Sequence, residues 1–211
     1  MRVVDLFSGL GGFSQAFLDR GHEVIRIDHN ERFSEVPETY IGDILELVPD
    51  DLWTIRAGYP DIILASPPCQ HFSIAAVSKH WKNGQPTKDT LQQIELVKHT
   101  IRLIEDVSPK YWILENPRGM LRKVIGKPSK TIPMCAYGKE AYKPTDLWGV
   151  FPPIDWLMPM KWEKAPRGSS LGVQGYGDPA VSALIPYDFS MAVCLAAEGN
   201  SPQRTIGDFE E

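Results

Sequence analysis

The sequence lacks the long apolar runs and the leader pattern that mark membrane and exported proteins. No window approaches the ~20 consecutive apolar residues that a membrane-spanning helix requires. The first residues, MRVVDLFSG, do not follow the charged, apolar and small-residue pattern of a signal peptide. We therefore expect a cytoplasmic protein with no membrane partner.

Cysteine is scarce as well. The three cysteines, Cys69, Cys135 and Cys194, lie far apart in the sequence and are odd in number. This arrangement fits neither a disulfide framework nor the CxxC pairs of a metal site. We therefore expect a reducing compartment and no bound metal.

An overall excess of positive charge is also missing, because the formal net charge is -5 at pH 7. This total argues against a generic nucleic-acid-binding protein, but the charge is unevenly distributed. Residues 118–167 carry 10 Lys and Arg against 4 Asp and Glu. Cations interleaved with aromatic rings suit phosphates and unstacked bases, although a solvated, proline-rich lobe with core aromatics has the same composition. The aromatic residues of this segment are Tyr137, Tyr142, Trp148, Phe151, Trp156 and Trp162.

The chain does contain a regular alternation of short apolar runs and amphipathic segments. The pattern predicts strands at residues 2–7, 23–28, 61–65 and 111–116, and helices at residues 13–18, 90–107 and 188–198. Thr90 is the expected N-cap of the longest helix. This alternation predicts an α/β fold, with a Rossmann-like, mostly parallel sheet covered by helices on both faces. Ligands of such a sheet sit beyond the carboxyl ends of the strands.

The first predicted strand ends at a glycine-rich loop, FSGLGGFS, whose glycines allow backbone N–H groups to approach a ligand closely. Ser14 stands at the third glycine position of the GxGxxG pattern, so a pyrophosphate is not the expected ligand of this loop. S-Adenosylmethionine contains no pyrophosphate, and it offers a ribose, an adenine and an amino-acid tail. Asp28, after the second strand, is placed to bind the ribose hydroxyls, and Asp43 to bind the adenine amine. The competing interpretation of both carboxylates is a solvated strand end.

Two further strand ends carry reactive side chains. The segment SPPCQHFS places Cys69 after the third predicted strand, where a catalytic group belongs. An inert structural cysteine is usually buried within a strand rather than placed between prolines and a glutamine. The segment ILENP places Glu115 at the end of the next strand. A carboxylate there is costly to bury unless it binds something.

Taken together, these segments resemble the cytosine-5 DNA methyltransferase family, in the same order, from residue 4 to about residue 149. DLFSGLGGF is similar to the family's cofactor loop, SPPCQHFS to its PCQ nucleophile loop, and ENP to its ENV segment. The resemblance makes Cys69 and Glu115 the catalytic residues, with Gln70 and Asn116 beside them.

The resemblance also implies the residues that bind the cofactor and the substrate. The cofactor, S-adenosylmethionine, is expected to contact Asp5, Phe7, Ser8, Gly9, Gly11, Gly12, Phe13, Asp28, His29, Asp43, Ile44 and Pro67. The implied substrate-binding residues are Ser73, Arg118, Lys139 and Lys143. The two lysines stand in YGKEAYKPTDLWG, a segment that resembles the region where the family has paired arginines.

The chemistry that the resemblance implies is methyl transfer to carbon 5 of cytosine in DNA. Because that carbon is a poor nucleophile, the thiolate of Cys69 first adds to carbon 6 and makes the ring an enamine. Glu115 hydrogen-bonds or protonates ring N3 and the exocyclic amine. The target cytosine is expected to be flipped out of duplex DNA so that the thiol reaches the face of the ring.

Within this family, the sequence predicts a cofactor-binding and catalytic domain at residues 1–126 and 184–199. A small basic and aromatic lobe, irregular or β-rich, is expected at residues 127–183, and a frayed tail at residues 200–211. The lobe is much shorter than the family's usual target-recognition region. The protein therefore reads a very short site, methylates with little sequence preference, or needs a partner subunit that chooses the target. Its small size resembles that of enzymes encoded by bacteria or their phages.

Three alternatives are compatible with part of the pattern. Amino-methyltransferases that act on adenine N6 or cytosine N4 also have a PP loop after a strand, but an aromatic residue follows it where this chain has Cys69. A tRNA cytosine-5 methyltransferase of the same family shares the active-site segments. A non-catalytic DNA-binding or regulatory protein on this fold is the third alternative, and the combination of cofactor loop, Cys69 and Glu115 argues against it.

Overall fold

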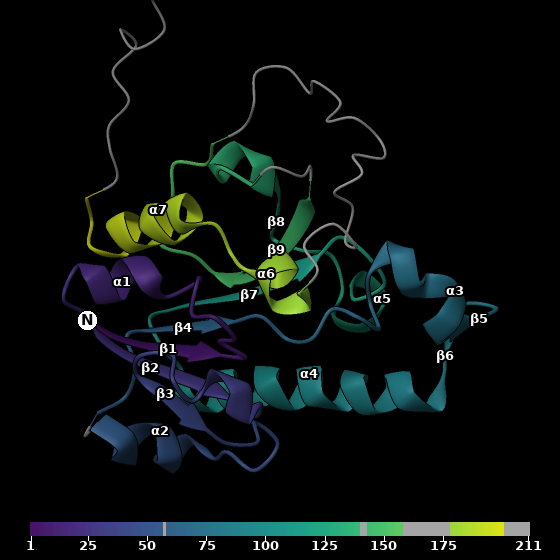
Figure 1. Ribbon diagram of the computed structural model, residues 1–211, viewed down its shortest axis with the longest axis horizontal. Helices are drawn as coiled ribbons and strands as arrows, with labels where there is room; N and C mark the ends of the chain where they lie inside the picture. Colours follow the sequence, from purple (N-terminus) through teal and green to yellow (C-terminus); the bar gives the residue numbers. More distant parts are fainter. Residues whose placement is uncertain (57, 140–142, 158–177, 201–211) are drawn as a thin grey trace, which may run out of the picture.

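The computed structural model in Figure 1 describes residues 1–56, 58–139, 143–157 and 178–200. Its centre is a seven-stranded sheet with the strand order β3-β2-β1-β4-β7-β9-β8. The strands are β1 (Arg2–Leu6), β2 (Glu23–Asp28), β3 (Thr39–Ile41), β4 (Ile62–Ala65), β7 (Tyr111–Pro117), β8 (Lys130–Pro133) and β9 (Pro144–Val150). The first five in spatial order pair in parallel, whereas β9 is antiparallel to both of its neighbours. The predicted α/β class with a mostly parallel sheet is confirmed.

Helices cover both faces of this sheet (Figure 1). One face carries α1 (Gln15–Asp19) and α7 (Tyr187–Ala197), and the other carries α2 (Pro49–Arg56) and the long α4 (Lys88–Val107). The remaining elements are short: η1 (Glu31–Phe33), η2 (Ile74–Ala76), α3 (Val77–His80), the hairpin β5 (Trp81–Lys82) and β6 (Gln85–Pro86), α5 (Arg122–Ile125), η3 (Met134–Tyr137) and α6 (Pro179–Ala183). No helix within the described residues is both long enough and apolar enough to cross a membrane.

The continuous apolar run of β4 is explained by burial on both faces of the sheet. Ile62 and Leu64 belong to the core under α1 and α7, whereas Ile63 and Ala65 belong to the core under α2 and α4. Successive side chains of a strand point to opposite faces. A strand at the centre of a doubly covered sheet must therefore be apolar at every position.

The connections around β1 create the binding edge of the sheet. The chain leaves β1 for β2 through α1, and it returns from β3 through α2 to pair β4 with the opposite side of β1. The loops that follow β1 and β4 consequently diverge, and a crevice opens between them at the carboxyl ends of the strands. The glycine-rich loop and the cysteine loop both begin at this crevice.

The sequence separates residues 127–183 from the main domain, but the structure joins part of this segment to the central sheet. β8 and β9 complete the edge beyond β7. The physical reason is that β9 is buried on both faces, with Leu147 in one core and Trp148 in the other. Residues 158–177 of the expected lobe and residues 201–211 of the expected tail lie outside the described residues.

Several aromatic residues that were expected to meet bases fill the interior instead. Tyr137 is 1% exposed and packs edge-on against Phe189 of α7, with ring centroids 5.1 Å apart. Trp148 is 6% exposed, and Phe151 packs against Trp156 at 5.4 Å. Tyr142 and Trp162 lie outside the described residues. The interpretation as core aromatics is correct for Tyr137 and Trp148, whereas Phe151 and Trp156 pack against the core and stay partly exposed.

The long helix begins earlier than its apolar pattern predicts. α4 starts at Lys88 with Thr87 as its N-cap, so Thr90 lies within the first turn and is fully buried. The hydroxyl of Thr90 donates to the carbonyl oxygen of His80 at 3.1 Å and lies 3.1 Å from Nδ1 of His71. Thr90 therefore ties the helix to the segment after the cysteine loop, a tertiary role that a local pattern does not reveal.

Gly149→Ala is expected to destabilise the sheet. Gly149 has a φ of 136°, and a Cβ there would overlap the carbonyl oxygen of Trp112 on β7. Because both groups are backbone in paired strands, the free energy of unfolding should fall by about 2–4 kcal/mol in a urea titration. Gly42→Ala is the control, since no atom lies within 4 Å of the added methyl group, and it should change stability by less than about 0.5 kcal/mol. Equal stability of the two variants would contradict the prediction.

Candidate active site

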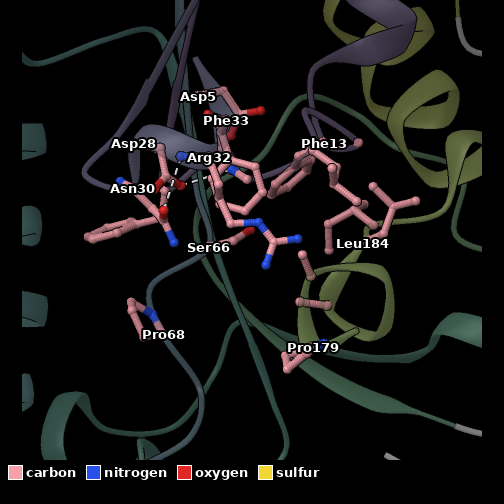
Figure 2. A pocket seen from close by; sticks show the side chains of 18 of the residues that line it. Asp5, Phe13, Asp28, Asn30, Arg32, Phe33, Ser66, Pro68, Pro179 and Leu184 are labelled. Carbon is pink, nitrogen blue, oxygen red and sulfur yellow. Dashed lines mark hydrogen bonds between the residues drawn. The ribbon is translucent and has the colours of Figure 1, made fainter. Parts of the chain in front are cut away.

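A cavity of about 250 Å³ lies at the crevice beyond β1, β2 and β4 (Figure 2). Its walls come from the loops after β1 and β4, the end of β2 with η1, and α6 with the two residues that follow it. The volume suits one small molecule rather than a polymer chain. The predicted cofactor-binding residues that line the cavity are Asp5, Phe7, Ser8, Gly9, Gly12, Phe13, Asp28 and His29.

The loop after β1 forms a tight turn at the cavity wall. Phe7 and Gly9 have positive φ angles of 61° and 51°. The peptide N–H of Gly11 donates to the carbonyl oxygen of Ser8 at 2.7 Å. A positive φ costs a non-glycine residue on the order of 1 kcal/mol, and strain of this kind concentrates at ligand sites. Phe7 holds such a conformation at the point where β1 opens into the cavity.

Arg26 of β2 holds the glycine loop from within the protein. It is fully buried, its Nε donates to Ser14 Oγ, and its Nη2 donates to the carbonyl oxygen of Gly11 and to Gln15 Oε1, each at 2.9 Å. A Cβ at Gly11 would overlap the guanidinium group, so glycine is required there. Sequence reasoning missed Arg26. The signal was a lone arginine inside an otherwise apolar strand, where an unpaired charge is almost never buried.

The carboxylate of Asp28 stands at the end of β2 and is fixed by two backbone donors (Figure 2). Its Oδ2 accepts from the N–H of Gly9 and its Oδ1 from the N–H of Asn30, each at 2.9 Å. The side chain is only 8% exposed. Each carboxylate oxygen can accept a further hydrogen bond. Asp28 is therefore pre-oriented to receive a pair of donors, such as two neighbouring hydroxyls.

Three buried polar atoms of the cavity wall have no hydrogen-bond partner among the described residues: Asp5 Oδ1, Ser8 Oγ and Ser66 Oγ. The other oxygen of Asp5 accepts from Ser14 Oγ at 2.7 Å. Burial raises the pKa of Asp5 to about 6, against the hydrogen bond from Ser14 and the charge of Arg26. An unsatisfied buried polar atom costs about 1–3 kcal/mol. A polar small molecule that bonded to these atoms would remove that cost.

Four predicted cofactor residues do not line the cavity. Gly11 packs on the guanidinium of Arg26, and Ile44 is 1% exposed in the core. Asp43 is exposed and its Oδ1 accepts from the N–H of Leu45 at 2.9 Å. The carbonyl oxygen of Pro67 accepts from Asn116 Nδ2 at 2.9 Å. These residues shape the surroundings of the cavity and do not form its wall.

The wall formed by η1 and α6 was not predicted from the sequence. Arg32 of η1 donates to Asp178 at 2.6 Å, and Asp178 caps α6 by accepting from the N–H of Ala180 at 2.8 Å. Pro179 and Leu184 line the cavity (Figure 2), and Leu184 packs against Gly12 of the glycine loop. The dipeptide Asp178-Pro179 is a helix-start signal that sequence reasoning could have used. The local sequence does not show that this helix packs beside the cavity.

Cys69 lies in the loop after β4 and is partly exposed. Its carbonyl oxygen accepts from the N–H groups of Phe72 at 3.0 Å and Ser73 at 2.9 Å, which closes a tight turn. The N–H of Met120 donates to the carbonyl oxygen of Phe72 at 2.7 Å, and Ser73 bridges to Gly119. The cysteine loop is thus pinned to the segment that follows β7.

The register of the sheet places Glu115 beside this loop. Ala65, the last residue of β4, pairs with Leu114, so Glu115 is the first residue of β7 beyond that pair. The next residue, Asn116, is fully buried and donates to the carbonyl oxygen of Pro67. The cysteine loop and Glu115 therefore lie at the ends of adjacent strands, and Asn116, the neighbour of Glu115, is hydrogen-bonded to the loop.

Glu115 is a buried carboxyl group that faces the ammonium group of Lys143. The side chain is 5% exposed, and Lys143 Nζ lies 3.8 Å from Oε1, an atom without a hydrogen-bond partner in the described part of the chain. Burial raises the pKa of Glu115, whereas the charges of Lys143 and Lys139 oppose that shift. The carboxyl group is thus biased toward its protonated form, in which it can donate a hydrogen bond.

The thiol of Cys69 responds to the charges of Lys143 and Glu115. Burial raises the pKa of Cys69, the positive charge of Lys143 lowers it, and the charge of Glu115 raises it. The thiolate is the reactive form of cysteine. Lys143 is therefore the group that favours the thiolate, and a Glu115 that becomes protonated no longer disfavours it.

The remaining predicted residues are distributed around this centre. Gln70 lines the cavity, so it stands between the cavity and Cys69. Arg118 is exposed and follows β7, where its N–H donates to the carbonyl oxygen of Pro144 at 2.9 Å. Lys139 donates through Nζ to two carbonyl oxygens next to α6.

A second group of ligand-type side chains lies at the amino ends of the strands, on the opposite edge of the sheet. His22 Nε2 is 2.7 Å from Glu198 Oε1, and Cys194 Sγ is 3.9 Å from the same oxygen. Arg20 already donates twice to the Glu198 carboxylate and helps to lower its pKa to about 2. Burial raises the pKa of Cys194 to about 12, which disfavours the thiolate that binds metals. This group is an ion-pair network that ties α7 to α1.

Comparison with known proteins gives a consistent result. The family model of the C-5 cytosine-specific DNA methylase matches residues 1–133. A relative from Frog virus 3, named "Probable DNA (cytosine-5)-methyltransferase", is 30% identical over 70% of this chain and 70% of its own length. Type II methyltransferase M.HgiGI of Herpetosiphon aurantiacus is 28% identical over 59% of this chain and 97% of its own length.

Among solved structures, the methyltransferase EhMeth of Entamoeba histolytica is similar to this chain with a TM-score of 0.52. The sequence identity is 18%, and the match covers 78% of this chain and 57% of that chain. The match supports the Rossmann-like methyltransferase fold. This chain spans little more than half of that protein.

The buried carboxyl group of Asp5 predicts a specific pH dependence of stability. Its pKa is about 6 in the folded protein and about 3.9 when unfolded, so the folded state binds more protons between these values. Stability therefore falls as the pH rises through this window, by about 3 kcal/mol from this group. Asp5→Asn removes the titration, so the stability of the variant relative to the unaltered protein should be about 2 kcal/mol higher at pH 7 than at pH 4. Urea titrations at the two pH values test this, and a difference that does not change with pH would refute it.

Proposed function

Because the chain belongs to the C-5 cytosine-specific DNA methylase family, we propose that Cys69 and Glu115 carry that family's reaction here, the S-adenosylmethionine-dependent methylation of carbon 5 of cytosine in DNA. The observation that carries this assignment is the pairing of β4 with β7. It sets the cysteine loop beside a buried carboxyl group, with Asn116 hydrogen-bonded across the two segments.

The cavity beyond β1 and β2 fits S-adenosylmethionine. The pre-oriented carboxylate of Asp28 suits the two ribose hydroxyls, and the unpartnered atoms of Asp5, Ser8 and Ser66 suit the polar amino-acid tail. In a dinucleotide enzyme the glycine loop contacts a pyrophosphate. In this protein the backbone of the loop would instead pack closely against S-adenosylmethionine. When bound, S-adenosylmethionine would supply an electrophilic methyl group and would leave as S-adenosylhomocysteine. Gln70, which directly follows Cys69, lines the cavity, so the cavity adjoins the cysteine loop.

Cys69 begins the reaction by adding its sulfur to carbon 6 of cytosine, which makes carbon 5 nucleophilic. Lys143 assists because its charge lowers the pKa of the thiol. After carbon 5 has been methylated, a base removes its proton, the carbon–sulfur bond breaks, and the thiolate of Cys69 leaves. The electron pair that sulfur used to form the carbon–sulfur bond returns to sulfur when that bond breaks, and the enzyme is regenerated.

Glu115 stabilises the charge that develops during addition. Its burial favours the protonated carboxyl group, which donates a hydrogen bond to ring N3 as negative charge accumulates there. Positioned acids of this kind contribute about 10²–10⁴-fold to rates. The unpartnered carbonyl oxygen of Asn116 is the neighbouring acceptor in the described part of the chain, while its amide nitrogen holds the loop of Cys69.

The target cytosine is flipped out of the duplex in this proposal. Glu115 is almost completely buried, so a base that remains stacked in a double helix cannot reach it. Enzymes that react on the atoms of a base remove it from the stack. A flipped nucleotide presents one face to Cys69 and its Watson–Crick edge to Glu115.

The DNA backbone is held by a basic surface beside the cysteine loop. Residues 62–88 and 116–139 contain no Asp or Glu, and they carry nine Lys and Arg although the chain has a net charge of -5. The two segments are joined by the hydrogen bond from Met120 to Phe72. The exposed Lys82 of the β5–β6 hairpin and the exposed Lys123 of α5 belong to this surface. Such a surface suits the phosphates on either side of a flipped base.

The alternative reactions are not favoured by the comparisons. The family match and the DNA-directed names of the relatives favour DNA over tRNA as substrate and carbon 5 over an exocyclic amine. The cofactor residues, Cys69 and Glu115 together argue against a non-catalytic role. The choice of target sequence is proposed to depend on the short segment at residues 158–183 or on a partner subunit.

The reaction itself is tested by nucleoside mass spectrometry of duplex DNA incubated with S-adenosylmethionine. The unaltered protein should produce 5-methyldeoxycytidine, and Cys69→Ala should lower the rate by more than about 10³-fold because the covalent step is lost. Cys135→Ala is the matched control, since this partly buried thiol lies in η3 outside the site, and it should remain active. Methylation of an exocyclic amine, or an active Cys69→Ala variant, would overturn the proposed chemistry.

The covalent step has its own test with DNA that contains 5-fluorodeoxycytidine at the target. The fluorine cannot be removed as a proton, so Cys69 cannot be expelled after methyl transfer, and the protein should stay attached to the DNA on a denaturing gel. Cys69→Ala should give no attached species. Attachment that survives this substitution would assign the nucleophile to another residue.

The basic surface predicts a weaker salt dependence of DNA binding when it loses charge. If Lys82 and Lys123 each contact a phosphate, replacing both with glutamine should reduce the slope of log Kd against log salt concentration by about 2, because each contact releases ~0.9 counterion. Lys98→Gln is the control, because Lys98 lies on α4 and pairs with Glu95 at 3.0 Å. A slope that is unchanged in the double variant would exclude these lysines from the DNA interface.

A further inference from the structure

The helix α6, which forms one wall of the cavity, makes few packing contacts with the rest of the protein through its own side chains. The helix is five residues long, and none of its residues is buried. A helix of this length is not stable by itself in water. The position of α6 therefore depends on contacts at its two ends.

The first end is held by an ion pair across the mouth of the cavity. Arg32 Nη2 lies 2.6 Å from Asp178 Oδ2, and the two side chains are 47% and 39% exposed. Exposed pairs of this kind contribute little to stability. The contacts at the C-terminal end of α6 therefore contribute more to fixing its position.

The second end is held by packing and by Lys139. Ile185, two residues after the helix, is buried in the core, and Leu184 packs against Gly12 of the glycine loop. Lys139 adds two hydrogen bonds. Its Nζ donates to the carbonyl oxygen of Ser182 at 2.8 Å and to that of Leu184 at 2.9 Å. These carbonyls belong to the last turn of α6, where backbone acceptors have no partner within the helix. A cation at that position also favours the negative end of the helix. Leu184, whose carbonyl is bound, is itself part of the cavity wall.

We propose that Lys139 is a positioning residue that holds the α6 wall against the S-adenosylmethionine cavity, so that cofactor affinity depends on its ammonium group. This inference rests on the proposed function, because it takes the occupant of the cavity to be S-adenosylmethionine. The resemblance to the methyltransferase family assigns Lys139 to substrate binding. Two donors of its ammonium group are directed instead to the cofactor wall.

The charge of Lys139 is also linked to the catalytic centre. Burial lowers the pKa of Lys139 to about 8, the neighbouring charge of Lys143 lowers it further, and Glu115 raises it. Among the described residues, the carboxylate of Asp188 of α7 also lies close by, next to Gly138. Above about pH 8 the ammonium becomes an amine, which donates weaker hydrogen bonds and carries no charge for the helix end.

The test is the affinity for S-adenosylmethionine, measured by isothermal titration calorimetry of the unaltered protein, Lys139→Met and Lys98→Met. Lys139→Met should raise Kd by about tenfold at pH 7, the size expected for lost charge-assisted hydrogen bonds. In the unaltered protein Kd should rise between pH 7 and 9, and Lys139→Met should lose most of that rise. Lys98→Met, which removes an exposed cation of α4 that pairs with Glu95, should match the unaltered protein.

The outcomes separate this inference from the proposed function. If the unaltered protein does not bind S-adenosylmethionine, the proposed function fails, and this inference fails with it. If the unaltered protein binds and a folded Lys139→Met binds equally well, or keeps the same pH dependence, only the inference is overturned.

If Lys139→Met does not fold, a second variant tests whether the position of α6 controls cofactor affinity. Asp178→Asn removes the ion pair with Arg32 and keeps a side chain that caps a helix well. It should raise Kd by a few-fold with the pH dependence near 8 retained. An unchanged Kd would show that the fastening of α6 does not control cofactor binding.

Discussion

The parallel pairing of β1, β4 and β7 is the constraint on which the active site depends. Parallel strands end at the same edge of a sheet, so the glycine loop, the cysteine loop and Glu115 are brought together although about 100 residues separate the first from the last. A change of register by one residue would turn Glu115 to the other face. The apolar residues on both faces of β4 keep that register, because a shift would exchange two packed cores.

The polar groups buried at this edge are arranged for ligands rather than for stability. Asp5, Arg26 and Glu115 are ionisable groups almost without solvent contact, and such burial is costly unless partners compensate. Arg26 has its partners in the glycine loop and fixes that loop. Asp5 and Glu115 each keep an unpartnered oxygen among the described residues. These two positions are the ones that the proposed cofactor and the proposed base would complete.

The cavity and the proposed catalytic centre share neighbouring residues. Gln70 follows Cys69 directly and also lines the cavity. Lys143 faces Glu115, while Lys139, four residues earlier, binds the helix that forms one wall of the cavity. The resemblance sets Lys139 and Lys143 in the region of the family's paired arginines, and the presence of lysines there has a structural consequence. A lysine provides a compact charge whose pKa shifts on burial, whereas an arginine stays charged.

The sequence by itself determined the α/β class, the order of the strands along the chain, and the placement of Asp28, Cys69 and Glu115 at strand ends, because apolar periodicity and the short segments around these residues are local properties. It did not determine that β8 and β9 join the sheet, that Tyr137 and Trp148 belong to its cores, or that α6 returns to close the cavity. It also missed Arg26 and Arg32, whose partners lie far along the chain or across a turn. These features were decided only by the tertiary structure, because they depend on which distant surfaces need to be covered.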